Sequence, residues 1–180
     1  MTPIKWRAPK TTKRGDNLKL SDQWEILNEA RDRVPVPVKS LPAMLGLELR
    51  AAFLNSGISG MLEKKDDSFL LTVNATDPDT RQRFTLAHEL GHYMLHRHLV
   101  GDGLDDDRAY RSTEVGKYHN TLIGPKEETE ANKFAANLLM PREAINRERI
   151  RLNDNVSDMA RLFGVSEHAM SIRMGVPYDG

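Results

Sequence analysis

The sequence has 180 residues, of which 39% are hydrophobic and 29% charged, with a formal net charge of zero and no cysteine. This composition suits one globular domain with its own core, and the balanced charge gives no general affinity for nucleic acid or anionic membranes. Without cysteine, disulfides and thiolate metal sites are excluded. No stretch approaches the roughly 18 apolar residues of a membrane span, and no secretory signal is recognisable, so we expect a cytoplasmic protein without a membrane partner.

The first nineteen residues are basic and rich in turn-forming residues. Six lysines and arginines stand against one acid, Asp16, and there is little hydrophobic periodicity. We interpret residues 1–19 as a flexible basic arm and residues 20–180 as the folded domain. An arm that contacts an acidic partner is the alternative.

Two helices are predicted next. The pair Ser21-Asp22 can cap a helix that runs to about Arg33, where the Pro-x-Pro segment 34–37 ends it. A short helix begins again near Pro42, since proline is well tolerated in a first helical turn.

Three segments of alternating apolar and polar residues follow, at about 47–53, 58–63 and 68–74. Such alternation is typical of half-buried strands, and short polar turns separate the segments. In the first segment, Leu49 and Phe53 would share the buried face. We therefore predict a small antiparallel three-stranded meander.

The segment 83–95 contains the motif His88-Glu89-x-x-His92. Histidines four residues apart leave a helix about 40° apart, so both imidazoles can reach one metal ion. Zinc fits best, because it accepts imidazole and tolerates a tetrahedral site with one open position. Glu89 can then serve as general base towards a water at the ion.

An ordinary amphipathic helix with two exposed histidines is the alternative reading of this motif. The apolar residues around the motif form a continuous stripe at helical spacing, which places the histidines at the edge of a core. The stripe consists of Phe84, Ala87, Leu90, Gly91, Met94 and Leu95. Asp79 or Thr80 can cap this helix.

Residues 101–124 are polar, and loops of such length in compact domains are commonly functional. We expect this segment to form a rim of the site. Four of its residues could stabilise an oxyanion or contact substrate, although each could equally serve only in loop packing: Tyr110, Arg111, Tyr118 and His119.

The C-terminal third is predicted to be helical. Apolar residues recur with helical spacing across 127–140, which indicates a second core helix, and a short helix follows Pro141. Residues 155–174 read as helix, glycine turn and capped helix, the outline of a helix-turn-helix.

Two histidines leave zinc one protein ligand short. His98 has the spacing of a third histidine in some zinc sites, but Leu95 stands where those sites need a turning glycine. His96 lies about 12 Å along the helix axis from His88, too far to share its ion. His119 and the acidic residues of the 101–124 segment remain open as ligands.

A carboxylate from the second core helix is the favoured third ligand. Glu128 shares one helix face with Ala131 and Ala135, so it would project from the end of the buried stripe. Glu127 and Glu130 are the alternatives, although carboxylates at a helix N-terminus usually face solvent.

The blocks 84–92 (FTLAHELGH) and 128–141 (ETEANKFAANLLMP) together resemble the ImmA/IrrE family of bacterial and phage metallopeptidases, over roughly residues 36–174. The resemblance implies an α+β, zincin-like domain in which the small sheet packs on the two core helices. It also implies a gluzincin-like Zn²⁺ site formed by His88, His92 and Glu128, with Glu89 catalytic. Asn132, one turn after Glu128, is our candidate for orienting a ligand.

The resemblance further implies a zinc-dependent endopeptidase that cleaves a specific regulatory protein, such as a helix-turn-helix repressor or an antitoxin encoded nearby. Two other hypotheses stay open. One is a non-enzymatic, zinc-containing regulator that binds DNA through residues 155–174, and the other is a toxin–antitoxin component that acts by binding a partner. We do not expect direct nucleic-acid binding, because Arg161 and Arg173 are the only arginines or lysines in that stretch.

Overall fold

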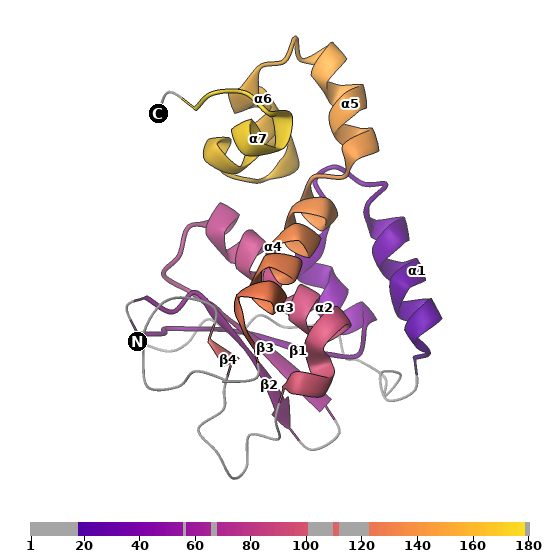
Figure 1. Cartoon of the computed structure of the whole chain (residues 1–180), viewed down its shortest axis with the longest axis vertical. Coiled ribbons are helices and arrows are strands. Elements are labelled where there is room, and N and C mark those ends of the chain that lie inside the picture. The colour runs from indigo at the N-terminus through magenta and orange to yellow at the C-terminus, as the bar shows by residue number, and fades with distance from the viewer. Residues whose placement is uncertain (1–17, 56, 66–67, 101–109, 112–122, 179–180) are drawn as a thin grey trace.

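The computed structural model places the sheet at one end of the molecule and the C-terminal helices at the other, with two long helices between them (Figure 1). The arrangement is the predicted α+β fold. The structure describes residues 18–55, 57–65, 68–100, 110–111 and 123–178. Nearly all of the predicted basic arm and the acidic part of the 101–124 segment lie outside these ranges.

The N-terminal helices follow the prediction, with a different start. Helix α1 spans Leu20–Ala30, and its N-cap residue is Lys19, which makes no side-chain cap hydrogen bond. The Ser21 hydroxyl instead donates to the Asp22 carboxylate, so the predicted Ser21-Asp22 cap is wrong. The 3₁₀ turn η1 (Val38–Ser40) leads into the short helix α2 (Leu41–Met44), which has a proline in its first turn as expected.

Four strands form one mixed sheet in the order β1-β3-β2-β4. They are β1 (Glu48–Ala52), β2 (Gly60–Lys65), β3 (Ser68–Asn74) and β4 (Tyr110–Arg111). Strands β2 and β3 pair antiparallel, as predicted, and β4 adds antiparallel to β2. The predicted antiparallel meander is nevertheless wrong, because β1 pairs with β3 in parallel.

Asn74, at the end of β3, accounts for the difference. Its side-chain amide donates to the Ile58 carbonyl (2.9 Å), and its side-chain oxygen accepts from the Leu54 amide (3.4 Å). These bonds hold the connection between β1 and β2 across the end of β3, so β1 reaches the far side of that strand. Alternation of apolar residues assigns faces but not neighbours, which is why it missed this pairing. Leu49 of the edge strand β1 and Phe53 just after it are exposed, so the prediction that they share a buried face is wrong.

Helix α3 (Asp79–His96) packs on β2 and β3, and helix α4 (Pro125–Leu139) packs on α3. The N-cap of α3 is Pro78, so neither Asp79 nor Thr80 has the predicted capping role. A short 3₁₀ turn, η2 (Arg97–Leu99), follows α3.

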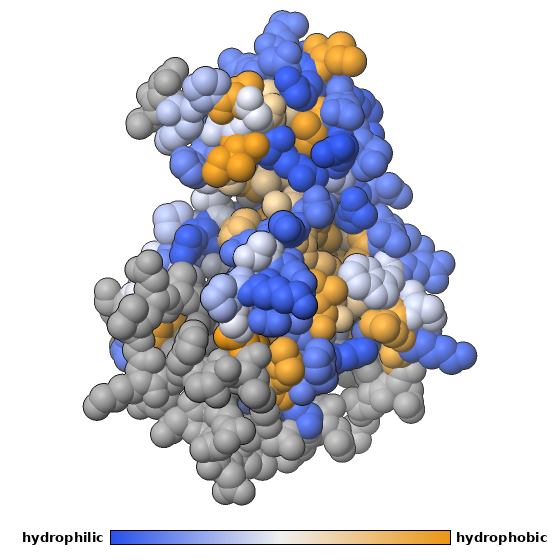
Figure 2. Space-filling model, viewed as in Figure 1, coloured by the Kyte–Doolittle hydropathy of each residue, from blue (hydrophilic) through white to orange (hydrophobic). Residues whose placement is uncertain are grey.

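Three short helices complete the chain: α5 (Arg142–Arg151), α6 (Val156–Phe163) and α7 (Glu167–Met174). The last two start at side-chain caps, Asn155 and Ser166, and Gly164 turns between them with a φ of +65°. This is the predicted helix-turn-helix outline. The face drawn in Figure 2 is mostly hydrophilic over these helices, with separate hydrophobic residues among them. Within the described residues, no helix has the length and apolarity needed to cross a membrane.

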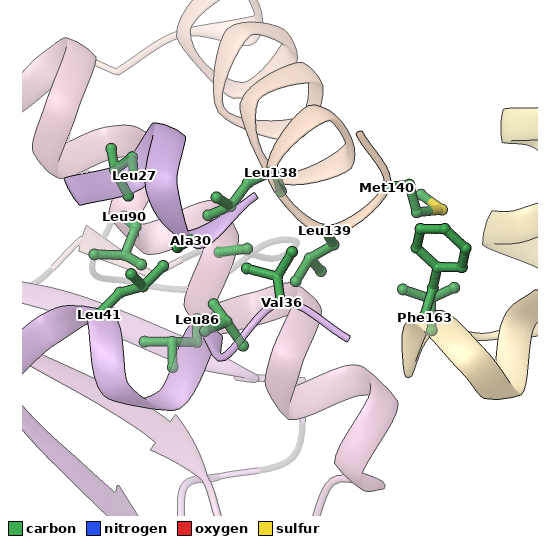
Figure 3. Close-up of a cluster of buried hydrophobic side chains, with 14 of the residues drawn as sticks. Leu27, Ala30, Val36, Leu41, Leu86, Leu90, Leu138, Leu139, Met140 and Phe163 are labelled. Carbon is green, nitrogen blue, oxygen red and sulfur yellow. The ribbon is translucent and has the colours of Figure 1, made fainter. Parts of the chain in front are cut away.

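The core is continuous between the two ends of the molecule. Leu86 and Leu90 of α3 are buried together with Leu139 of α4, and Phe163 of α6 joins the same cluster (Figure 3). Arg83 reinforces this junction, because its buried guanidinium donates to the carbonyls of Gly164 (2.9 Å) and Val36 (3.0 Å). The helical C-terminal end is therefore packed on the part of the fold that carries α3.

Candidate metal centre

Helix α3 places the three residues of its motif at the boundary between the core and the outside. His92 and Glu89 have no exposed surface, and His88 is nearly as buried. Their burial follows from the packing of α3, because the motif residues lie beside Leu86 and Leu90, which belong to the core. Leu95, the last residue of the predicted stripe, is exposed. Polar side chains so deeply buried require compensating partners.

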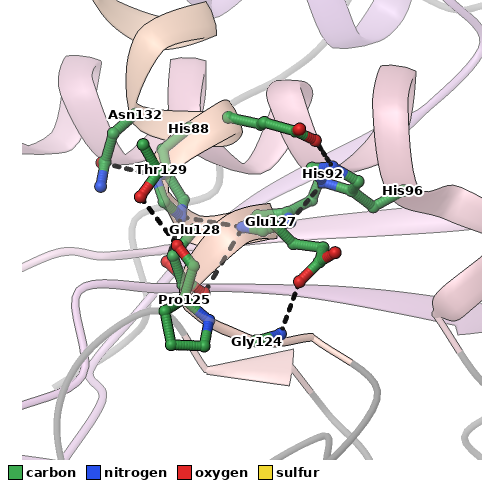
Figure 4. Close-up of polar contacts among 10 residues, drawn as sticks. His88, His92, His96, Gly124, Pro125, Glu127, Glu128, Thr129 and Asn132 are labelled. Atoms are coloured by element: carbon green, nitrogen blue, oxygen red, sulfur yellow. Dashed lines mark hydrogen bonds and ion pairs between the residues drawn. The ribbon is translucent and has the colours of Figure 1, made fainter.

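Helix α4 brings Glu128 to both histidines (Figure 4). One Glu128 oxygen lies 3.3 Å from His88 Nε2, and the other lies 3.7 Å from His92 Nε2. The two Nε2 atoms are 3.0 Å apart. The structure thus brings together all three ligands expected from the sequence, with their donor atoms within 4.8 Å of one another. Glu128 is partly exposed, so the cluster is open towards solvent on that side.

The close approach of α3 and α4 depends on Gly91. A Cβ atom at this position would lie 3.1 Å from the Ala131 Cα and 3.1 Å from a ring carbon of Phe134. A side chain here would crowd the Ala131 backbone and the Phe134 ring, so glycine suits the close approach of the two helices. Gly91 therefore helps to set the separation between the histidines and Glu128.

Asn132 lies against His88 from the same helix. Its side-chain oxygen is 3.0 Å from His88 Nδ1, which places an acceptor opposite that nitrogen. The Nδ1–H group therefore donates to Asn132, and Nε2 is the nitrogen that faces Glu128 and His92. The side chain suggested from sequence spacing for orienting a ligand thus contacts the ring of His88.

His92 has a different neighbour on its second nitrogen. His96 Nδ1 lies 3.2 Å from His92 Nδ1, and His96 Nε2 lies 3.0 Å from a Glu130 carboxylate oxygen. From the sequence, His96 is too far from His88 to share an ion, and Glu130 is only an alternative third ligand. The signal that was available is the four-residue spacing of His92 and His96, which continues the series begun by His88.

The surroundings shift the pKa values of the two histidines in opposite directions. Burial, followed by the proximity of His88 and His96, lowers the pKa of His92 to about 2, so this imidazole is neutral at ordinary pH. Burial also opposes protonation of His88, but the hydrogen bond and charge of Glu128, with the charge of Glu89, outweigh it and raise the pKa of His88. A cation at the cluster is therefore favoured by the two carboxylates.

These donor atoms fit a zinc ion. Two imidazole lone pairs and a carboxylate converge within 3.0–3.7 Å, an arrangement in which a shared cation relieves the repulsion between acceptors. Two histidines and one glutamate also form a known donor set for catalytic zinc, with the fourth position open.

Strand β2 closes the site beside Glu89. A Cβ atom at Gly60 would lie 2.3 Å from the Thr85 methyl group and 3.4 Å from a Glu89 carboxylate oxygen. Gly60 thus permits the backbone of β2 to pass directly over α3 at the motif. Gly60 is not among the residues predicted from the sequence, although a glycine within a predicted strand is a signal of close backbone approach.

Two other candidates that the structure describes, His98 and Glu127, are not part of the cluster. His98 is exposed in η2, and Glu127 receives a hydrogen bond from the Gly124 amide (2.9 Å), so it caps α4. Tyr110 and Arg111 form β4, where their backbones pair with Leu62 and Met61 of β2. Tyr118 and His119 lie outside the described residues.

Comparisons with known proteins agree with this geometry. The family model described as Peptidase_M78, IrrE N-terminal-like domain, matches residues 45–174. A solved structure, a Mycobacterium tuberculosis transcriptional regulator, is similar with a TM-score of 0.58 at 15% sequence identity. The match covers 89% of this chain but 48% of that one, so the chain spans about half the length of the regulator. The search of curated proteins found no match.

At this identity the regulator shares the fold alone, whereas the family match covers most of the chain. The family match supports a metallopeptidase-like function, and the cluster of His88, His92 and Glu128 is consistent with it. The chain belongs to the Peptidase_M78 family of IrrE N-terminal-like domains.

Proposed function

We propose that the protein is a zinc-dependent endopeptidase. The observation that carries this proposal is the convergence of His88, His92 and Glu128 beside the buried carboxylate of Glu89. His88, His92 and Glu128 would hold the ion, and Glu89 would do the proton chemistry. No cysteine is available for a thiolate site, which also favours this donor set.

When bound, zinc supplies a Lewis acid that activates water and polarises the carbonyl of the scissile bond. Glu89 accepts the proton of the attacking water and passes it to the leaving amine. Its burial beneath β2 suits this role, because bulk water is kept away from the carboxylate that carries the proton.

Stabilisation of the oxyanion requires a further donor. Tyr110, Arg111, Tyr118 and His119 are proposed for this role, or for substrate contact. The position of Tyr110 and Arg111 on β4, next to the strand that passes over Glu89, supports including them.

The proposed substrate is a single regulatory protein in the cytoplasm, either a helix-turn-helix repressor or an antitoxin encoded nearby. The resemblance of the motif blocks to the ImmA/IrrE family supports this choice. The similar solved structure is that of a transcriptional regulator, which is compatible with a regulatory setting.

The direct test mixes the purified protein and zinc with the product of a neighbouring gene and looks for a discrete fragment. We expect cleavage by the wild type, loss of cleavage with a chelator, and loss with Glu89→Gln despite full zinc content. Glu29→Gln, an exposed glutamate on α1, is the matched control and should cleave normally. Cleavage that persists in Glu89→Gln would exclude the mechanism.

Metal content tests the ligands separately. His88→Ala and Glu128→Ala should each lose most of their zinc, because three protein ligands are the minimum that a catalytic zinc site retains. Full zinc occupancy in Glu128→Ala would instead point to Glu130 as the third ligand.

A regulator that acts by binding DNA or a partner is the alternative function, and the helix-turn-helix outline of α6 and α7 favours it. The two arginines of this helix pair, however, already have partners within the chain. Arg161 pairs with Asp158 (2.9 Å), and Arg173 donates to the Met140 carbonyl (2.9 Å). A gel shift at low salt would support DNA binding, and copurification of an intact partner with both the wild type and Glu89→Gln would support a toxin–antitoxin role.

A further inference from the structure

The geometry points to His96 and Glu130 as positioning residues that hold His92 in the tautomer that binds zinc. This inference rests on the proposed zinc site. It assigns a role to two side chains that lie outside the ligand set and that the mechanism above does not use. His96 lies at the end of α3, next to the site (Figure 4), and Glu130 belongs to α4.

The two residues are placed by the same helix pair that forms the site. His96 lies one turn after His92 on α3 and is buried, whereas Glu130 comes from α4 and is partly exposed. Their contact, 3.0 Å from His96 Nε2 to the Glu130 oxygen, therefore spans the same junction as the contact of Glu128 with His88.

The direction of each hydrogen bond follows from the carboxylate. An ionised Glu130 can only accept, so His96 Nε2–H donates to it. In a neutral imidazole the other nitrogen is then an acceptor, so His96 Nδ1 accepts the proton of His92 Nδ1–H across 3.2 Å. This assignment leaves the lone pair of His92 on Nε2, the atom that faces His88 and Glu128.

His96 is not an additional ligand in this arrangement. Its Nδ1 atom contacts His92 Nδ1, which lies on the opposite side of the imidazole ring from Nε2. The route from Glu130 through His96 to His92 thus ends at the nitrogen that does not bind the ion. A carboxylate placed behind a histidine ligand fixes its orientation and increases its basicity.

His88 is also oriented by a residue of α4, but through a direct contact. Asn132 offers a neutral amide oxygen to His88 Nδ1 directly, whereas Glu130 acts on His92 through a second imidazole. The residues Glu128, Glu130 and Asn132 on α4 therefore provide one ligand and the ends of two orienting contacts.

Zinc affinity, measured by competition with a chelator, tests the inference. We expect His96→Leu to weaken zinc binding about 10–100-fold, the usual cost of losing such an orienting group. His96→Gln restores an acceptor for His92 Nδ1–H and should recover most of the affinity, and Glu130→Gln should have an intermediate effect. His98→Leu, an exposed histidine just beyond the helix, is the matched control and should bind normally.

The tautomers of His92 and His96 can be measured in the wild-type protein, so this test needs no variant. Long-range ¹H–¹⁵N spectra of the zinc-loaded protein should show His96 protonated on Nε2 alone and His92 protonated on Nδ1 alone. A proton on His96 Nδ1 would overturn the inference, because His92 would then lack its acceptor.

The outcomes separate this inference from the proposed function. If the wild type binds zinc, His96→Leu weakens binding and no substrate is cleaved, the positioning role stands and the peptidase proposal fails. If cleavage occurs and His96→Leu binds zinc like the wild type, only the positioning role is overturned. A wild type that binds no zinc would overturn both.

Discussion

At the scale of single residues, the site distinguishes two histidines that the sequence motif presents as equivalent. The pKa of His92 is lowered to about 2, with burial as the largest cause, whereas the pKa of His88 is raised by Glu128 and Glu89 against the effect of burial. The second nitrogen of each ring also faces a different partner, His96 or Asn132. The two proposed ligands therefore have different surroundings.

Asn132 can be tested by removing and then restoring its acceptor. Asn132→Ala leaves His88 Nδ1–H without its partner at 3.0 Å, so we expect zinc affinity to fall about 10–100-fold. Asn132→Asp retains an oxygen in this position and should recover binding. Chelator competition measures both, and equal affinities of Asn132→Ala and the wild type would show that Asn132 does not orient His88.

At the scale of secondary-structure elements, the site is a property of the contact between α3 and α4. The histidines come from one helix and Glu128 from the other, so the distance between the helix axes decides whether three ligands meet. Gly91 allows that distance by leaving room for the Ala131 backbone and the Phe134 ring.

Gly91→Ala should push the two helices apart. The new methyl would stand 3.1 Å from the Ala131 Cα and 3.2 Å from its carbonyl oxygen, atoms that move only with the α4 backbone. Such overpacking costs about 1–3 kcal/mol, partly offset by the better helix propensity of alanine. We expect a lower free energy of unfolding in denaturant and weaker zinc binding, whereas Asn137→Ala, at an exposed position of α4, should show neither.

Most helices and strands could be predicted from the sequence, but some of the contacts between them could not. The helical pattern around His88-Glu89-x-x-His92 and the stripe of the second core helix predicted α3, α4 and the meeting of Glu128 with the histidines. The pairing of β1 was missed, because it depends on hydrogen bonds from the side chain of Asn74 to a loop. The contact between His96 and Glu130 was missed for a similar reason, since it requires the rotation of α4 relative to α3.

At the scale of the whole molecule, Arg83 connects the motif helix to the C-terminal end. Its guanidinium donates to the carbonyls of Val36, Phe163 and Gly164, and burial lowers its pKa against the opposing charge of Asp79. A single buried side chain therefore links α3 to the α6–α7 pair and to the segment after α1.

Arg83→Met should loosen this link. Several buried carbonyl groups would lose their donor, which costs about 1–3 kcal/mol for each group left unsatisfied. We expect faster hydrogen–deuterium exchange in α6 and α7, measured by mass spectrometry, with smaller changes in β2 and β3. Arg161→Met removes an exposed arginine of α6 and serves as the control.

Zinc should also contribute to the stability of the entire fold. The ligands come from separate helices, so the folded state binds the ion far more tightly than the unfolded chain, and free zinc at 1,000 times its dissociation constant would add about 4.1 kcal/mol. We expect the melting temperature of the wild type to rise with zinc concentration. Glu128→Ala should not show this rise; an equal rise would place the stabilising ion elsewhere.

The placement of Glu128, Glu130 and Asn132 on α4 has a consequence for how the site can be lost. Because one rigid segment carries a ligand and both outer contacts, a displacement of that segment withdraws all three together. Only the two histidines of α3 would then remain, one ligand fewer than a catalytic zinc site keeps, so we expect the ion to leave when α4 moves away. A molecule that separates α4 from Gly91 would therefore remove the ion from the proposed centre without contacting any of its ligands.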